Sequence, residues 1–375
     1  IGKFAPKLES CNNAALRAFL TRCAPETLAW LMELGLEFHG PSPEPPNRLP
    51  RMHNVVPNAK AYIAVLQRCA LRQGVRLLLG HRVESLVRDD QGALGGLEAR
   101  RPDSSLLRTA ARKGIILAAG DYSNGEAVKA DYLPPEVSTI EGINPYATGD
   151  GHVLARSAGA ELLNMHVVYG PEIRFIPPPR PPFSQLLPAN PLLAKFMART
   201  IGLVPKRVLT RIMKSLLVTW QHPETSLFRN GAILINRNGE RFADETGSPE
   251  LAIPRQPDKV AYILLDGKLN ELYSQWPHFI STAPEVAYAY VQDYKRLRPD
   301  VYAEANTVEA LALKIGVDAA ALRATLDEYR GAVQAGAPDR FGRSSFGSAF
   351  DQPPFTALGP AKSWIVTTEG GVRIN

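Results

Sequence analysis

A glycine-rich turn that opens a helix is the clearest chemical signal in this sequence. In "NPYATGDGHVLARSAGAELLNM" (residues 144–165), Thr148, Gly149 and Asp150 come directly before apolar residues at helical spacing. Backbone N–H groups and the helix dipole favour an anionic or strongly polar ligand at such a position. The turn therefore predicts a binding site, with a plain helix cap at Asp150 as the alternative.

A second signal lies upstream in "GIILAAGDYSN" (residues 114–124), a short apolar run that ends on Ala119 and Gly120. The run is too short for a stable helix and too apolar for an exposed strand, so we predict a central, buried strand. Runs of this kind often deliver the chain to a nucleotide. Tight packing of the strand without a ligand is the alternative.

The apolar periodicity predicts the elements that position these signals. Helices are expected over 24–35, 58–74, 153–162, 190–201, 206–216, 303–315 and 318–333. Strands are expected over 75–80, in a hairpin of 82–88 with 93–100, and in a hairpin turning at 237–239. Residues 40–51 form a proline-rich connector and 342–360 a loop-rich exit. This order predicts an α/β nucleotide-binding core interrupted by a second domain.

Composition limits the function classes. The net charge of +6 is local, because no acidic residue lies between Phe175 and Pro223 while seven basic ones do. No nucleic-acid reader motif accompanies them, so no nucleic-acid partner is expected. Cys11, Cys23 and Cys69 form no CxxC pair and indicate a reducing, cytoplasmic compartment. The scattered histidines predict no metal site, and the absence of GxSxG disfavours the commonest hydrolases.

Four blocks resemble, in the same order, the flavoproteins of the fumarate reductase, succinate dehydrogenase and 3-ketosteroid dehydrogenase superfamily. They are "GIILAAGDYSN", "NPYATGDGHVLARSAGAELLNM", "GAILINRNGERFADE" and "PPFTALGPAKSWIVTTEGGVRIN". The resemblance implies a Rossmann-like FAD-binding domain over 1–165 and 351–375, with an inserted α+β cap domain over 166–350. It implies FAD as cofactor and hydride transfer at a carbon–carbon bond next to a carbonyl.

Several residues match the superfamily's cofactor positions. Ala119 and Gly120 match its small pair, Asp150 its FAD-contacting aspartate, and Val83 a strand position near the adenine. The implied cofactor-binding set is Val83, Ala119, Gly120, Thr148, Gly149, Asp150, Gly370 and Gly371. Asp121 stands where relatives have a second glycine, which places a carboxylate near the expected cofactor edge.

Departures from the superfamily pattern bear on the substrate. The arginine expected four residues after Glu245 is Pro249, and paired histidines are replaced by Val366 and Thr367. Two carboxylates would be poorly neutralised without those cations, so a hydrophobic, ketosteroid-like or cyclic ketone substrate is expected rather than a small dicarboxylate. The candidates for proton transfer are Tyr169, His222, Arg229 and Arg241. For Arg241, turn and ion-pair chemistry with Glu245 is the alternative.

The resemblance also sets expectations beyond the chain. The N-terminal glycine fingerprint is expected before Ile1 and the last flavin segment after Asn375. A flavin-free ligand-binding or partner-binding remnant of the fold is the alternative to an enzyme, and the electron donor or acceptor stays unknown.

Residues 190–218 carry apolar stripes flanked by basic residues, which predicts two short amphipathic helices. They suit peripheral contact with the inner face of a membrane. A helical hairpin packed on its own core is the alternative.

Overall fold

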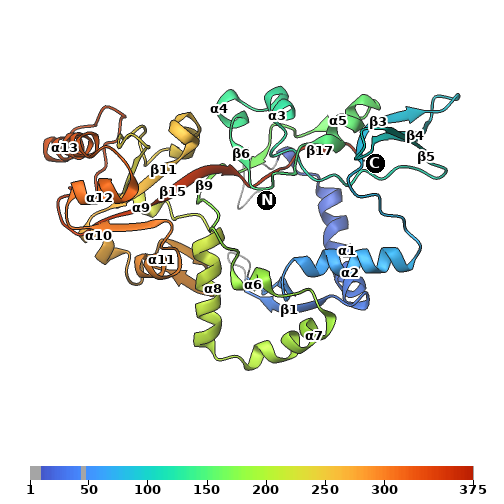
Figure 1. Cartoon of the computed structure of the whole chain (residues 1–375), viewed down its shortest axis with the longest axis horizontal. Helices are drawn as coiled ribbons and strands as arrows, with labels where there is room; N and C mark the ends of the chain where they lie inside the picture. Colours follow the sequence, from blue (N-terminus) through green and yellow to red (C-terminus); the bar gives the residue numbers. More distant parts are fainter. Residues whose placement is uncertain (1–9, 44–47, 375) are drawn as a thin grey trace. The chain divides into compact units, whose positions relative to one another are not determined.

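The computed structural model describes residues 10–43 and 48–374 (Figure 1). Contacts between residues divide the chain into two units. The first holds residues up to Leu79 together with Arg180–Arg211 and Pro284–Val286, and the second holds the remainder. The predicted boundaries at 165 and 350 stay predictions. Residues 44–47 of the proline-rich connector and the first residues of the chain lie outside the described residues.

The first unit is small and mostly helical. Its core consists of Leu36, Ala61 and Val65 with the half-buried side chains around them. Asn13 caps the first helix by accepting from the amides of Ala15 and Leu16. The elements are α1 (Ala14–Glu33), β1 (Glu37–Ser42), β2 (Met52–Val56), α2 (Lys60–Arg72), α6 (Phe183–Leu186), α7 (Pro191–Thr200), η2 (Ile201–Leu203) and the start of α8 (Lys206–Trp220).

The second unit is built on a six-stranded sheet whose main order is β10–β11–β15–β14. The long strand β15 also pairs with β9 in antiparallel and with β6 in parallel orientation. The sheet strands are β6 (Glu141–Gly142), β9 (Glu172–Phe175), β10 (Ile233–Ile235), β11 (Ala261–Leu265), β14 (Tyr302–Ala305) and β15 (Phe355–Ile365).

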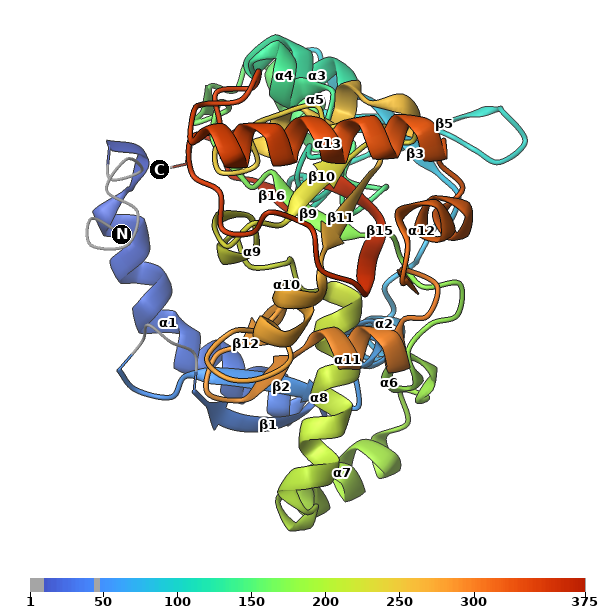
Figure 2. The ribbon, with the colours of Figure 1, turned by 90° about the vertical axis from the view of Figure 1, so that its left-hand side faces the viewer.

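Both faces of this sheet are buried at β10 and β11, whose residues form continuous apolar runs. Because side chains alternate along a strand, Ile233 and Ile235 face one core while Leu234 faces the other. One face packs against α12 (Val308–Ile315) and α13 (Ala319–Ala335), which are drawn in orange-red in Figure 2. The other packs against the end of α8 and against α9 (Ser226–Arg229), α10 (Gly267–Leu272) and α11 (Val291–Leu297).

Shorter elements complete the second unit. A three-stranded antiparallel sheet joins β3 (Arg82–Arg88), β4 (Leu94–Arg100) and β5 (Leu106–Ala110). The strand pairs are β7 (Leu162–Leu163) with β17 (Gly371–Val372), β8 (Val168–Tyr169) with β16 (Thr367–Thr368), and β12 (Ser281–Ala283) with β13 (Ala287–Ala289). The remaining elements are α3 (Glu126–Tyr132), α4 (Pro135–Ser138), α5 (Asp150–Ser157), η3 (Pro249–Leu251), η4 (Ile253–Arg255) and η5 (Pro257–Lys259).

Most predicted helices are confirmed. The helices α2, α7, α8 and α13 occur where the apolar periodicity placed them, and so does the β3–β4 hairpin. The helix predicted over 303–315 begins only at Val308, as α12, because Tyr302–Ala305 form β14. The first helix ends near Gly35 as predicted but begins ten residues earlier, at Ala14. The predicted helix over 153–162 ends at Ser157, and Leu162 belongs to β7.

Two strand predictions and one loop prediction were wrong. Residues 75–80 and 114–120 are irregular, and Ile116 is 92% exposed, so the predicted central, buried strand is absent. A parallel strand is stable only between neighbours, and the described part of the chain supplies none for either segment. The predicted exit loop instead enters β15 at Phe355. Gly359 and Pro360 of β15 lie where the register of its pairing with β11 shifts, between Ala261 and Ile263.

Candidate functional site

Three of the eight predicted cofactor residues line one cavity of the second unit. This cofactor cavity has a volume of about 630 Å³ and is lined by the start of β3, by residues 115–119 and by the first turns of α5. It brings Val83, Ala119 and Asp150 together from distant parts of the sequence. Arg82 also lines it and lies 3.5 Å from the Asp150 carboxylate. A volume in this range suits part of a large organic cofactor.

The glycine turn before α5 needs its glycines for space. Gly149 caps α5 in the left-handed region, with φ of +79°, and a Cβ there would lie 2.7 Å from the Cβ of Tyr122. A Cβ at Gly151 would lie 3.1 Å from that of Ala119. The small residues therefore let α5 begin directly against the chain at Ala119. Thr148 is exposed next to this turn, and Gly120 has φ of +80°.

A buried tyrosine and histidine support the two C-terminal glycines. Tyr122 donates to the carbonyl oxygen of Met165 at 2.7 Å, and burial raises its pKa to about 12. A Cβ at Gly370 would lie 2.7 Å from the Tyr122 hydroxyl, so the chain passes closer than another residue would permit. His152 packs its ring edge against Tyr122 and places Nε2 3.1 Å from the Gly370 carbonyl oxygen.

These residues fit an FAD-binding role. The Nδ1 atom of His152 is buried and has no hydrogen-bond partner in the described residues, and such an atom is costly without a ligand or water. Gly371 has open space around the position of a Cβ. A flavin dinucleotide would require three features that occur here. They are open backbone at Gly371, an unpaired polar atom, and a cavity beside a helix N-terminus.

Asp121 does not present a free carboxylate to this cavity. Its Oδ2 accepts from the Thr367 hydroxyl at 2.9 Å and from the Thr368 amide at 2.8 Å. Its Oδ1 accepts from the Ser123 hydroxyl at 3.0 Å. Two departures from the superfamily pattern, Asp121 and Thr367, are thus bonded to each other and fix the segment after Gly120 to β16.

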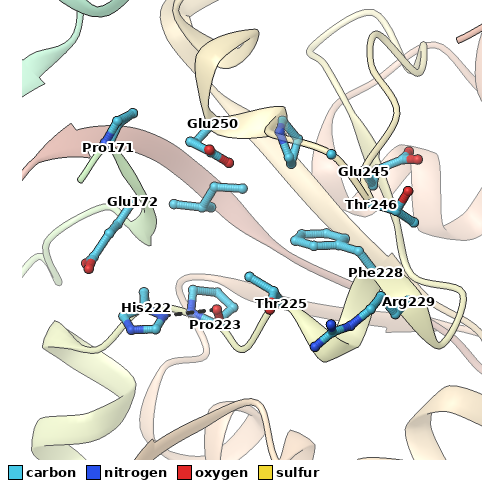
Figure 3. A pocket seen from close by; sticks show the side chains of 13 residues that line it. Pro171, Glu172, His222, Pro223, Thr225, Phe228, Arg229, Glu245, Thr246 and Glu250 are labelled. Atoms are coloured by element: carbon cyan, nitrogen blue, oxygen red, sulfur yellow. Dashed lines mark hydrogen bonds between the residues drawn. The ribbon is translucent and has the colours of Figure 1, made fainter. Parts of the chain in front are cut away.

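A second cavity, of about 330 Å³, contains part of the predicted catalytic set (Figure 3). We call it the substrate cavity. It lies between the start of β9, residues 222–229 and residues 245–250 of the second unit. His222 and Arg229 line it, Pro249 occupies the position of the expected arginine, and Glu250 lies beside it. Its apolar walls come from Pro171, Ile173, Pro223, Phe228 and Pro249.

The carboxylates around the substrate cavity differ in their partners. Glu172 is paired with Arg174 at 2.7 Å, and Glu245 lies within a buried ion network. Glu250 has no cation partner in the described residues, and burial raises the pKa of its carboxyl although Ser248 and its own backbone oppose the shift. A carboxyl in this state can hold a proton nearer to neutral pH. Glu250 was not among the predicted catalytic residues, because the superfamily pattern concerns the neighbouring position, Pro249.

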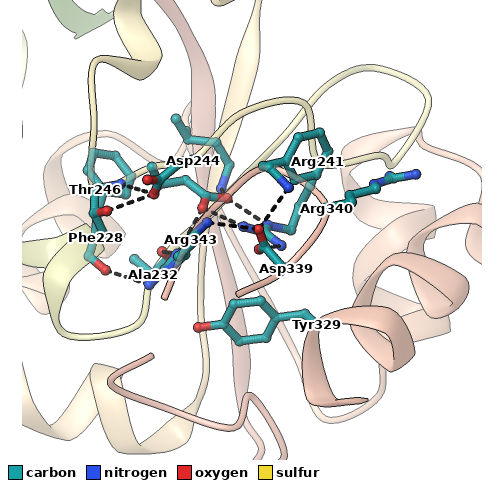
Figure 4. Close-up of polar contacts among 12 residues, drawn as sticks. Phe228, Ala232, Arg241, Asp244, Thr246, Tyr329, Asp339, Arg340 and Arg343 are labelled. Atoms are coloured by element: carbon teal, nitrogen blue, oxygen red, sulfur yellow. Dashed lines mark hydrogen bonds and ion pairs between the residues drawn. The ribbon is translucent and has the colours of Figure 1, made fainter. Parts of the chain in front are cut away.

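Arg241 belongs to an ion network rather than to the cavity wall (Figure 4). Its guanidinium donates to both oxygens of Glu245, at 2.8 and 2.7 Å, and to Asp339 at 2.7 Å. Arg343 donates to Glu245 at 2.8 Å and to the carbonyl oxygen of Phe228 at 2.6 Å. The network therefore joins α9, the turn after β10 and the segment 339–345, and it holds one wall of the substrate cavity.

The outcome for the predicted catalytic residues is mixed. His222 is half-buried, with Nδ1 3.2 Å from the Pro223 carbonyl oxygen, and Arg229 is exposed at the cavity. Tyr169 pairs with Thr367 in the β8–β16 pair, is 56% exposed and does not line the cavity. Arg241 serves the fold, as the ion-pair alternative predicted. No cluster of His, Cys, Asp or Glu suited to a metal ion occurs within residues 10–43 and 48–374.

Comparison with known proteins supports FAD as the cofactor. The model of the FAD binding domain matches residues 7–181. A probable fumarate reductase, Ifc3, of Shewanella frigidimarina is 25% identical over 97% of this chain and 53% of its own length. A 4-oxocyclohex-2-ene-1-carboxylate 5-dehydrogenase of Sinomonas cyclohexanicum is 26% identical over 77% of this chain and 43% of its own.

The fold has a counterpart among solved structures. The open conformation of a flavocytochrome c3 fumarate reductase covers 94% of this chain and 53% of its own, with 23% identity and a TM-score of 0.60. These comparisons show an FAD-binding domain in this chain, and its curated relatives include proteins named as reductases and dehydrogenases. Over nearly all of its length the chain is similar to fumarate reductase flavoproteins. It spans about half, or less, of the length of these relatives.

Proposed function

We propose that the protein is a flavin-dependent dehydrogenase or reductase that acts on a carbon–carbon bond next to a carbonyl of a hydrophobic substrate. The substrate class is a ketosteroid-like compound or a cyclic ketone. The lining of the substrate cavity carries this proposal, because apolar walls surround a single arginine, Arg229, among the described residues there.

The charges around the cavity argue against a small dicarboxylate. Arg229 is the one cation among the described lining residues, the arginines near Glu172 and Glu245 are already paired with those carboxylates, and Pro249 stands where a further cation is expected. A substrate with two carboxylates would place negative charge among these groups without enough donors to neutralise it. The Sinomonas relative is named for a cyclic oxo-acid with one carboxylate, and the Shewanella relative for fumarate. The cavity favours the cyclic ketone of these two classes.

FAD, when bound, would supply the hydride acceptor or donor, and the residues of this chain would position the substrate and move its proton. Arg229 is permanently charged and suits stabilisation of negative charge that develops on a carbonyl oxygen. Glu250 and His222 are the cavity groups suited to proton transfer, and Glu250 joins the candidates because burial favours its protonated form. Phe228 and Ile173 would exclude water from an apolar ring.

The test is anaerobic spectroscopy of the purified full-length flavoprotein. Saturated cyclic ketones and 3-ketosteroids are mixed with the oxidised protein, and the matching enones with the protein after reduction by dithionite. We expect bleaching or reoxidation with a member of the cyclic set and none with succinate or fumarate. Rapid turnover of fumarate, with no response to any cyclic ketone, would contradict the proposal while leaving the flavin assignment intact.

A further inference from the structure

Large apolar side chains are exposed in one continuous segment of the first unit, Arg180–Arg211, which spans α6, α7, η2 and the first residues of α8. Leu203 in η2 is 82% exposed, and Leu192 and Phe196 project outward from α7. The exposed apolar residues are Phe183, Leu186, Leu192, Phe196, Leu203 and Val208. A group of this size on one segment usually marks an interaction surface.

These side chains are not required by the core of the unit. The helix α7 contacts β1 and β2, with Ala194 buried and Leu193 and Met197 half-buried. Leu192 and Phe196 are therefore left outside after the inner side of the helix has packed.

All charged residues of the same segment are basic. Arg180, Lys195, Arg199, Arg207 and Arg211 are exposed, and none of them forms an ion pair with a described residue. No acidic residue occurs between Phe175 and Pro223. Elsewhere many arginines are paired, such as Arg100 with Glu84 and Arg156 with Asp131. The segment thus combines exposed apolar groups with uncompensated positive charge.

We propose that the Arg180–Arg211 surface docks on an anionic lipid membrane. The apolar side chains would enter the boundary between headgroups and acyl chains, and the cations would lie at the lipid phosphates. A nucleic acid would bind through the cations without using the leucines and phenylalanines. None of the described helices is long and apolar enough to cross a bilayer.

The test is flotation of the purified full-length protein with vesicles of phosphatidylcholine alone or mixed with phosphatidylglycerol, at roughly 0.1 M salt. The native protein should float with the anionic vesicles and much less with the neutral ones. A charge variant, Arg199→Glu, Arg207→Glu and Arg211→Glu, should lower the partition coefficient about five-fold or more for each cation. An apolar variant, Leu192→Ser, Phe196→Ser and Leu203→Ser, should also lose binding.

Two matched controls show that the position of the changes matters. Leu313→Ser alters an apolar side chain of α12 that is 83% exposed outside the segment. Arg17→Glu, Arg72→Glu and Arg112→Glu reverse three exposed cations of other segments. Both controls should float like the native protein, and circular dichroism confirms that every variant is folded. The proposal is overturned if the native protein does not float with anionic vesicles, or if the apolar variant binds unchanged. Equal loss in the controls would also overturn it.

Discussion

Glu250 differs from the other carboxylates of the substrate cavity in what neutralises it. Glu172 and Glu245 have arginine partners, whereas burial alone dominates at Glu250 and raises the pKa of its carboxyl. Glu250→Gln keeps the shape and removes the proton donor, so we expect turnover to fall by about 10²- to 10⁴-fold if Glu250 moves a proton. Glu172→Gln is the matched control at the same cavity. A Glu250→Gln protein with native turnover and a native pH profile would exclude this role.

The same carboxyl predicts how stability depends on pH. Its folded pKa lies above the unfolded value near 4.5, so its contribution is fully present below that value and is lost as the pH rises through the folded pKa. Glu250→Gln avoids this loss. We expect the free energy of unfolding of the variant to equal the native value at about pH 4 and to exceed it at about pH 8 in urea titrations. A variant that is less stable at the higher pH would contradict the assignment.

The pKa of the Asp339 carboxyl is shifted in the opposite direction, downward. Burial would raise the pKa of its carboxyl, but the Arg241 guanidinium lowers it below the usual 3.8. Its stabilising contribution is therefore present at neutral pH and is lost as the pH falls through the lowered pKa. Asp339→Asn leaves Arg241 with a missing partner, and we expect a loss of about 3–5 kcal/mol near pH 7 by urea unfolding.

A surface pair provides the control for that prediction. Asp327 pairs with Arg330 at 3.0 Å, and its side chain is 61% exposed. Asp327→Asn should cost only about 0–1 kcal/mol in the same titration. Equal losses at the two positions would show that the network around Arg241 is no more important to the fold than an exposed pair.

At the scale of elements, Asp121 fixes the segment after Gly120 to β16. Replacing it by the glycine expected from the superfamily pattern would leave the Thr368 amide without its acceptor. We expect Asp121→Gly to lower the free energy of unfolding by about 1–3 kcal/mol and to weaken flavin binding in a titration followed by fluorescence. Thr367→Val, which keeps the carboxylate and removes one donor, should have a smaller effect on both. Tighter flavin binding by Asp121→Gly would indicate that the carboxylate opposes the cofactor.

Local patterns predicted the elements that depend on neighbouring residues. The side chain of Thr307 caps the start of α12, and this helix ends at Gly316 in the left-handed region. The side chain of Asp318 caps α13 in the same way, and that helix ends at the left-handed Gly336. The strands over 75–80 and 114–120 could not be judged in this way, because a strand forms only with partners supplied by other parts of a chain. The strand β15 was missed because glycine and proline normally interrupt strands.

In the candidate sites, too, features of consecutive residues were predicted and contacts between distant residues were not. The turn over Thr148–Gly151 was predicted because its residues are consecutive and begin a helix. The bond between Asp121 and Thr367 joins positions 246 residues apart, and the ion pair of Arg241 with Asp339 joins positions 98 apart. No local pattern indicates such contacts. Residues that are neighbours in the sequence could therefore be singled out in advance, whereas the contacts that form the walls of the substrate cavity could not.

At the scale of the whole molecule, the cofactor residues and the substrate cavity lie in the second unit, and the basic apolar segment lies in the first. Flavin binding and membrane docking can therefore be tested separately. Charge reversal at Arg199, Arg207 and Arg211 should leave the flavin content unchanged while it abolishes flotation. A variant that loses flavin together with membrane binding would contradict this separation.

The central claim is that this chain forms an FAD site, and its visible spectrum tests that claim most directly. The full-length protein is purified, incubated with FAD, freed of unbound cofactor and scanned. We expect the absorption of oxidised flavin with one FAD bound per chain, and less flavin in Asp150→Ala, which alters the cavity at the start of α5. A folded protein that stays colourless after reconstitution would contradict the account and would favour a flavin-free ligand-binding function.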